Sequence, residues 1–364
     1  MKRKMLSSIL ALTLAFSLTA CSAGTKEEAS NISDAADASN TLDEVVSDEA
    51  DAEDVSAQEE DTEYPIIIEH AYGQTIIEAK PERVATISWG NQDTPLALGV
   101  SPVGISEANY GVIDGSGILP WTKTAIEELG ADTEIFKDTA GLDYEAISDV
   151  QPDVILAAYS GITQEEYDLL SQIAPVVAYP NLAWQTYWRD QIIMDATGMG
   201  MQDEGEQLVA DLDGLIAQKA GDYPQIQGKK AAFFYFMPTD LGTFYVYLPT
   251  DPRAAYLLDL GMEFPESVLA LATESGSFSL EMSAENADAL QDIDIIIAYG
   301  NSDLLEALQA DALLGTIPAI QNGSVAMIED GTPIAASSTP SALSIPATID
   351  DYLKLIGEAA DKVK

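Results

Sequence analysis

The sequence predicts an α/β protein in which two α/β lobes, each built on a central sheet, are joined by one long backbone helix. Strand-like apolar runs alternate with helix-like segments over residues 64–182, and the alternation returns over residues 223–364. Between them, residues 183–222 carry a long helical pattern. Strand–helix alternation indicates parallel sheets, because a crossover must return the chain before the next parallel strand begins. A length of 364 residues is sufficient for two such lobes.

The first lobe is expected to open with short strands at residues 65–69 and 75–78, joined by a turn at Tyr72 and Gly73 as in a hairpin. A buried strand is expected at 83–88, a helix at 91–98 that ends at Gly99, and a strand at 102–105. A helix, a strand, a helix and a strand then follow at 144–150, 153–158, 164–173 and 176–179.

The connecting helix is predicted over residues 183–220, where apolar residues recur every four positions from Trp184 to Ala196. Glycines at positions 198, 200 and 205 are the points at which it is open to interruption. The second lobe is expected to begin with a strand at 229–237. Its remaining segments are helices at 254–260, 285–289, 304–309 and 345–362 and strands at 293–299 and 325–327.

The first 21 residues resemble a bacterial lipoprotein signal peptide. A basic run at residues 2–4 precedes an apolar stretch at 5–18, which is shorter than the roughly 20 residues of a membrane-spanning helix. The stretch ends in the sequence LTAC, which resembles a lipobox, and Cys21 is the only cysteine of the chain. We therefore expect lipid on Cys21 to anchor the chain to the membrane, and no internal disulfide. An ordinary signal peptide with a chance cysteine is the alternative.

Residues 22–63 are dominated by Ala, Ser, Asp and Glu and hold no aromatic residue. Such a segment cannot bury enough apolar surface to offset its ordering entropy, so we expect an acidic disordered tether. The whole chain holds 61 Asp and Glu against 16 Lys and Arg, a formal net charge of -45. This charge disfavours nucleic acid and anionic lipid headgroups as partners. It is compatible with solvation alone or with attraction of a cationic ligand.

The sequence lacks the residues that several classes of activity require. His70 is the single histidine, so neither a His-rich metal site nor a Ser-His-Asp triad is expected, and we interpret His70 as a surface or strand residue. The chain shows no G-x-S-x-G, Walker loop or H-E-x-x-H motif and no G-x-G-x-x-G after a strand. We therefore expect no enzymatic activity, resident metal or cofactor.

Three segments, in this order, resemble the iron-siderophore and cobalamin family of ABC-transporter substrate-binding proteins. They are residues 79–84 (AKPERV) with 96–104, residues 141–147 (GLDYEAI) with 151–155 (QPDVI), and residues 318–325 (PAIQNGSV). The resemblance covers residues 64–364 and implies two rigid lobes with a ligand cleft between them. Residues 159–163, 173–180 and 251–253 further resemble the branch that binds ferric hydroxamate or catecholate siderophores in Gram-positive bacteria.

The resemblance implies a monomer, lipid-anchored on the extracytoplasmic face of the cell membrane, that captures a ferric siderophore and delivers it to the permease dimer of an ABC importer. Family members carry one exposed glutamate on each lobe that docks arginines of the permease. By position, Glu145 and Glu285 match these two, although both are also readable as ordinary surface carboxylates. Haem or cobalamin binding on the same fold is the alternative, and a non-transport surface sensor or an enzyme is a more remote one.

A siderophore arrives with its metal already coordinated, so its site needs shape, aromatic faces and a few polar groups rather than metal ligands. Clefts of α/β folds form at strand ends, and candidate aromatic residues cluster there. They are Trp89, Trp121, Tyr159, Tyr179, Trp184, Tyr235, Tyr245, Tyr247 and Tyr299.

Two arginines, Arg253 and Arg189, can donate hydrogen bonds to hydroxamate or catecholate oxygens, although Arg189 is also readable as a surface charge. Few cations lie between Trp89 and Arg253, which disfavours a highly charged catecholate chelate. The sequence thus favours a neutral or cationic ferric hydroxamate, such as a ferrioxamine.

Overall fold

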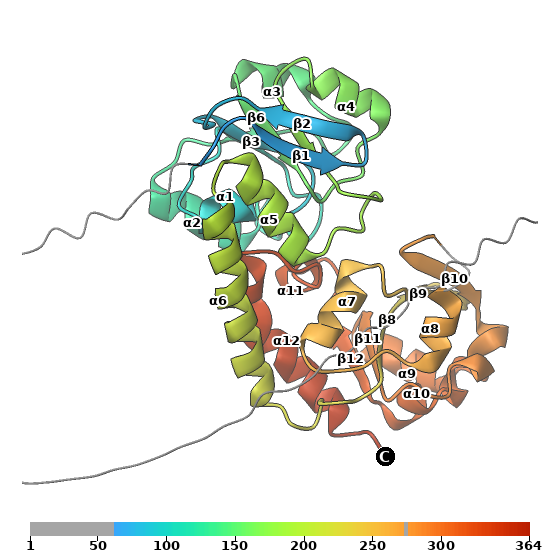
Figure 1. Ribbon diagram of the computed structural model, residues 1–364. Coiled ribbons are helices and arrows are strands. Elements are labelled where there is room, and N and C mark those ends of the chain that lie inside the picture. Colours follow the sequence, from blue (N-terminus) through green and yellow to red (C-terminus); the bar gives the residue numbers. More distant parts are fainter. Residues whose placement is uncertain (1–61, 273–275) are drawn as a thin grey trace, which may run out of the picture. The chain divides into compact units, whose positions relative to one another are not determined.

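The computed structural model describes residues 62–272 and 276–364 (Figure 1). The described residues all belong to one compact unit. The expected signal peptide, Cys21 and nearly all of the expected tether lie outside the described residues. Within the described ranges, no helix combines the length and the apolarity that a membrane crossing requires.

The sheet of the N-terminal lobe has five parallel strands in the order β5-β4-β3-β6-β7. They are β3 (Val84–Thr86), β4 (Gly104–Ser106), β5 (Glu134–Phe136), β6 (Val154–Ala157) and β7 (Val176–Ala178). Every residue of β3, β4, β6 and β7 is buried, as is typical of parallel strands covered on both faces. The lobe also holds α1 (Asp93–Ala97), α2 (Pro120–Leu129), α3 (Tyr144–Asp149), α4 (Gln164–Leu170) and the antiparallel hairpin of β1 (Ile66–His70) and β2 (Gly73–Ile77).

The sheet of the C-terminal lobe is mixed and has the order β10-β9-β8-β11-β12. Its strands are β8 (Ala231–Met237), β9 (Asp240–Tyr247), β10 (Ser279–Ser283), β11 (Ile295–Tyr299) and β12 (Val325–Ile328). Strands β8, β11 and β12 run parallel, whereas β9 and β10 form an antiparallel edge. The helices are α7 (Pro252–Asp259), α8 (Glu266–Ala272), α9 (Ser302–Ala310), α10 (Pro318–Asn322), α11 (Pro333–Ala336) and α12 (Ser344–Ala360), with 3₁₀ turns η1 (Ala284–Ala289) and η2 (Leu314–Thr316).

The prediction of one continuous connecting helix over residues 183–222 is wrong. The structure has two helices, α5 (Trp188–Gly198) and α6 (Gln202–Gly221), which pack against each other. Gly200 separates them with a φ of 71°, a left-handed conformation that favours glycine and cannot continue a helix. A Cβ at Gly200 would also lie 2.0 Å from the Tyr64 hydroxyl, so the close approach of the N-terminal chain needs glycine here.

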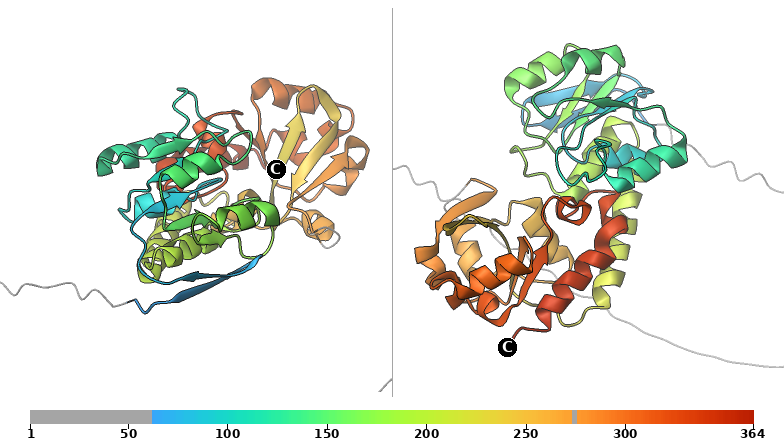
Figure 2. Two further views of the ribbon diagram at one scale, coloured as in Figure 1. Left: turned by 90° about the horizontal axis from the view of Figure 1, so that it is seen from above. Right: turned by 180° about the vertical axis from the view of Figure 1, so that it is seen from behind.

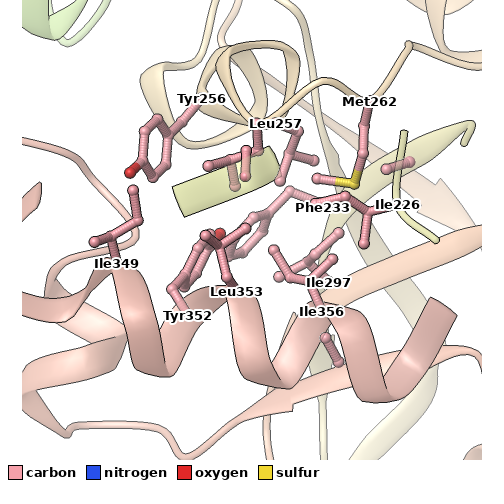
Figure 3. Close-up of a cluster of buried hydrophobic side chains, with 14 of the residues drawn as sticks. Ile226, Phe233, Tyr256, Leu257, Met262, Ile297, Ile349, Tyr352, Leu353 and Ile356 are labelled. Atoms are coloured by element: carbon pink, nitrogen blue, oxygen red, sulfur yellow. The ribbon is translucent and has the colours of Figure 1, made fainter. Parts of the chain in front are cut away.

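The core of the C-terminal lobe lies between its sheet and α12 (Figure 3). Leu353 and Ile356 of α12 are fully buried and belong to one apolar cluster with Phe233 of β8 and Ile297 of β11. Helix α12 also packs along α6, which Figure 2 shows as the red and yellow-green helices running side by side. The sheet, α12 and α6 are thereby tied together, which connects the interlobe helices firmly to the C-terminal lobe.

The predicted α/β class with two sheets is confirmed, and most predicted segments fall on observed elements. Sequence reasoning missed α2 and β5 in the first lobe. In the second lobe it missed β9, β10, α8, α10, α11 and the 3₁₀ turn η2. The segment predicted as a helix at residues 285–289 is the 3₁₀ turn η1.

Candidate functional site

A pocket of about 720 Å³ is lined by residues from both lobes. On the N-terminal side, the lining comes from the carboxyl ends of parallel strands. Ser88 follows β3, Glu107 follows β4, Asp138 follows β5 and Tyr159 follows β6. Parallel strands bring these ends to one edge of a sheet, which is where α/β proteins bind their ligands.

Seven of the residues that the sequence proposed for ligand contact line this pocket. They are Trp89, Tyr159, Trp184, Tyr235, Tyr247, Arg253 and Tyr299. Two further aromatic lining residues, Tyr110 and Phe278, were missed because they lie in loops without a recognisable pattern. The lining is therefore rich in aromatic faces contributed by both lobes.

Trp184 forms part of the N-terminal wall. Its ring meets that of Tyr159 edge to face, with centroids 5.4 Å apart. The indole also lies directly on Gly161, where a Cβ would come within 2.1 Å of Nε1. Trp184 itself has a φ of 61°, so its backbone occupies a left-handed conformation that side chains rarely adopt. The absence of a side chain at Gly161 thus sets the position of the tryptophan.

The C-terminal wall is organised around Arg253. Its Nε and Nη2 donate to the two carboxylate oxygens of Asp251 at 2.8 and 2.6 Å, and its Cζ lies 4.0 Å from the ring centroid of Tyr247. Burial lowers the pKa of Arg253, but the ion pair with the fully buried Asp251 outweighs it and raises that pKa well above its ordinary value. Burial also raises the pKa of the nearby Tyr299 to about 12, so this phenol stays protonated.

Four carboxylates, those of Glu107, Asp138, Glu166 and Asp330, also line the pocket. Lys137 lies 3.0 Å from Glu107, whereas Asp138 accepts a hydrogen bond from the uncharged Ser106. Burial raises the pKa of Asp138. Among the described residues that line the pocket, Arg253 is the only one with a cationic side chain, and it is already paired, so the pocket disfavours an anionic ligand.

A buried amide pair holds the strand ends that carry Trp89 and Tyr159. Asn91 donates to the carbonyls of Ile87 and Tyr159 at 2.7 and 3.0 Å and accepts from the Tyr159 N–H at 2.9 Å. Gln191 of α5 donates to Asn91 Oδ1 and to the Trp89 carbonyl at 3.0 and 3.2 Å. Two buried amides thus join α5 to the pocket wall.

Two predicted contact residues are core residues instead. Trp121 is buried and donates from Nε1 to Asp93 at 3.1 Å, so its indole is used inside the lobe. Tyr179 is buried beside the hairpin, where its hydroxyl lies 2.5 Å from that of Tyr72. Neither lines the pocket, which corrects the sequence-based assignment for both.

Two further assignments are corrected by surface contacts. Arg189 forms ion pairs with Asp213 and Asp259 and stacks on Trp188. Tyr245 donates to Glu281 at 2.7 Å across the β9–β10 edge. Neither lines the pocket.

The remaining assignments concern residues outside the pocket. His70 ends β1, is buried, and lies 2.9 Å from Thr75 Oγ1, and burial lowers its pKa. No group of three or more His, Cys, Asp or Glu that could hold a metal occurs in the part of the chain that the structure describes. Glu145 and Glu285 are exposed in the first turns of α3 and η1, one on each lobe. Their role in docking stays a prediction.

Residues 84–331 match the family model of periplasmic binding proteins, and the chain belongs to this family. Among solved structures it is similar to PiaA of Streptococcus pneumoniae TIGR4, an iron uptake ABC transporter substrate-binding protein solved in complex with ferrichrome. That structure shares 51% sequence identity, covers 82% of this chain and 100% of its own, and has a TM-score of 0.80.

Curated relatives are more distant. The probable siderophore-binding lipoprotein YfiY of Bacillus subtilis (strain 168) is 25% identical over 235 residues, which are 64% of this chain and 67% of YfiY. The Fe(3+) dicitrate-binding periplasmic protein FecB of Escherichia coli (strain K12) is 23% identical over 281 residues, or 73% of this chain and 86% of FecB. The resemblance noted in the sequence is thereby confirmed at the level of the family.

Proposed function

We propose that this protein binds a ferric hydroxamate siderophore outside the cytoplasm and delivers it to the permease of an ABC importer. The observation that carries the proposal is the aromatic pocket of about 720 Å³ whose single arginine is already paired. A volume in this range suits a small-molecule ligand. The similarity to a protein solved with ferrichrome supports the same chemical class.

The charge of the pocket decides between siderophore classes. Three hydroxamates balance the charge of Fe³⁺, whereas three catecholates leave a trianion. An anion would enter beside four carboxylates with one paired guanidinium to receive it, which is electrostatically unfavourable. Arg253 uses Nε and Nη2 for Asp251, and a guanidinium carries further N–H donors that a hydroxamate oxygen can accept.

The proposal includes the membrane anchor and the permease. Lipid on Cys21 would hold the protein at the extracytoplasmic face of the membrane, and the acidic segment at residues 22–63 would act as the tether. Glu145 and Glu285 would meet basic residues of the permease. Exposed ion pairs contribute only about 0–1 kcal/mol each, so these two would orient the complex more than strengthen it.

Ligand binding is tested by quenching of tryptophan fluorescence in the full chain, kept in a mild detergent. Ferrichrome, ferrioxamine B, ferric enterobactin, haem and cobalamin are titrated in turn. We expect saturable quenching by a ferric hydroxamate at micromolar or lower concentration. Tighter binding of ferric enterobactin, haem or cobalamin would overturn the assignment to hydroxamates, and haem or cobalamin would identify the alternative ligand.

Arg253 has a matched control in Arg189, because each is paired with aspartate and stacked on an aromatic ring. We expect Arg253→Lys to weaken hydroxamate binding about tenfold, since lysine lacks the planar fork of donors. Arg189→Lys should leave the dissociation constant within about twofold, since Arg189 does not line the pocket. Equal effects of the two substitutions on the dissociation constant would contradict a role for Arg253 in ligand binding.

Docking is tested by uptake of radioactive iron into cells that carry Glu145→Ala with Glu285→Ala. We expect siderophore binding to be retained and uptake to be lost. The control replaces exposed glutamates elsewhere on the same lobes, Glu128 on α2 and Glu306 on α9, and should preserve uptake. Normal uptake by the first variant would exclude the docking role.

A further inference from the structure

One loop of the N-terminal lobe crosses to the C-terminal lobe beside the pocket. Tyr110, which follows β4, donates from its hydroxyl to Asp330 Oδ1 at 2.5 Å. The same hydroxyl accepts the N–H of Gly331 at 3.1 Å. Asp330 and Gly331 follow β12, so a single phenol makes two hydrogen bonds to a turn of the other lobe.

The loop fits closely onto the second lobe. The Tyr110 ring meets Tyr299 edge to face at a centroid separation of 6.2 Å. The next residue, Gly111, has a φ of 80°, and a Cβ there would lie 2.5 Å from that of Ala336 and 3.0 Å from the Thr332 carbonyl. Glycine is therefore required for the loop backbone to reach α11 this closely.

These contacts lie at the solvent side of the pocket. Tyr110 and Asp330 both line it, and Asp330 is exposed. With both hydrogen bonds formed, the pocket still encloses about 720 Å³. The bonds therefore leave the space for a ligand free.

A second hydrogen bond between the lobes differs in kind. Ser341, which precedes α12, donates to Asp93 of α1 at 2.5 Å, and both residues are fully buried. When a buried hydrogen bond to a carboxylate breaks, no water is present to replace it, whereas water can replace the Tyr110 hydrogen bonds. Separation of the lobes is thus easier at Tyr110 than at Asp93.

We propose that Tyr110 and the Asp330–Gly331 turn form a latch that holds the lobes closed over the bound siderophore and sets how long it stays. The latch rests on the proposed function, since it acts on that ligand. Its bonds must break before the lobes separate, so the latch contributes to the dissociation rate. Association begins with the lobes apart, before the bonds form, and depends on them little.

The test measures association and dissociation of ferrichrome and ferrioxamine B by stopped-flow fluorescence on the full chain in mild detergent. Tyr110→Phe keeps the ring on Tyr299 and removes the hydroxyl, and Asp330→Ala removes the acceptor. We expect each to raise the dissociation rate about five- to tenfold, because both remove the hydrogen bond to the Asp330 carboxylate at a partly exposed site. The double variant should resemble Tyr110→Phe, which already removes both hydrogen bonds of the phenol.

Tyr245→Phe and Glu281→Ala are matched controls, since this phenol–carboxylate pair lies within one lobe and outside the pocket. Both should leave the rates unchanged. Gly111→Ala tests the latch independently, because a methyl group there pushes the loop from α11 and should also hasten dissociation.

Three outcomes decide the matter. Dissociation rates within twofold of the original for Tyr110→Phe and Asp330→Ala, in proteins that bind siderophore, would overturn the latch alone. Faster association with an unchanged dissociation rate would also overturn the latch, because the bonds would then hinder entry of the ligand rather than its release. A chain that binds neither siderophore would overturn both the latch and the proposed function.

Discussion

The carboxylate of Asp93 offers a measurable consequence of burial. It lies in the first turn of α1 and is fully buried, with no cation beside it. Its hydrogen-bond donors are all uncharged: Trp121 Nε1 at 3.1 Å, Thr122 Oγ1 at 3.0 Å, Gln92 Nε2 at 3.2 Å and Ser341 Oγ at 2.5 Å. Burial raises the pKa of Asp93 to about 6 even though these donors oppose the shift.

This shift makes stability depend on pH in a defined direction. Between the unfolded value of 3.8 and the folded value of about 6, the folded state binds the proton more tightly than the unfolded state does. Stability contributed at this site is therefore greatest at low pH and falls as pH rises through that window. A difference of about two pKa units corresponds to a loss of about 3 kcal/mol.

The substitution Asp93→Asn removes this dependence, because the amide does not titrate. We expect the free energy of unfolding of the variant, relative to the original protein, to rise by about 3 kcal/mol between pH 4 and pH 7. The asparagine amide also makes poorer hydrogen bonds with the surrounding donors than the carboxylate does. This changes the free energy of unfolding of the variant by an amount that does not vary with pH. Denaturant unfolding of both proteins at each pH separates the two effects.

The exposed Asp132 provides the control, and Asp132→Asn should show no comparable change over this range. A difference between the original protein and Asp93→Asn that stays constant within about 1 kcal/mol would refute the reasoning, since the carboxylate would then titrate alike in both states. A variant that loses stability relative to the original as pH rises would refute it more strongly.

Three further predictions concern other positions. Burial raises the pKa of Asp195 well above its ordinary value, so Asp195→Asn should gain stability relative to the original protein as pH rises from 4 to 7, measured by the same unfolding series. Leu353→Ala should cost about 2–5 kcal/mol of unfolding free energy, because the fully buried side chain leaves a cavity between α12 and the sheet (Figure 3). Gly161→Ala should displace Trp184 and weaken siderophore binding about tenfold in a fluorescence titration, whereas Gly214→Ala, which meets no neighbour within 4 Å, should not.

Strands buried on both faces were the most predictable part of the fold. The residues of β6, Val154–Ala157, are all buried, and the continuous apolar run shows this directly in the sequence. Strand β5 is only three residues long and begins with an exposed glutamate, so its pattern is too short to recognise. The break in the connecting helix falls at Gly200, one of the three glycines at which the sequence left the helix open to interruption, but no local pattern indicates which of the three breaks it.

The sequence predicts the kind of site, an aromatic pocket with an arginine, but not which residues line it. Tyr245 and Tyr247 lie two positions apart on β9 and therefore on the same face of the sheet. Two residues of strand span about 7 Å, and only Tyr247 lines the pocket. The sequence indicates which face a residue occupies but not where the pocket ends along the strand. Arg189 likewise finds its partners at Asp213 and Asp259, which no local pattern indicates.

Division of the pocket between two lobes links affinity to lobe separation. Trp184 and Tyr159 belong to one wall and Arg253 and Tyr247 to the other, so a ligand held by both walls loses one set of contacts when the lobes move apart. Dispersion contacts and hydrogen bonds weaken steeply over about 1 Å, so a small opening releases much of the binding energy. In the proposed function, a permease that docks on one exposed site of each lobe would therefore release the ligand without touching the pocket. In the proposed function, the latch residue Tyr110 would oppose the separation of the lobes by the permease, and its loss should speed release more than it lowers specificity.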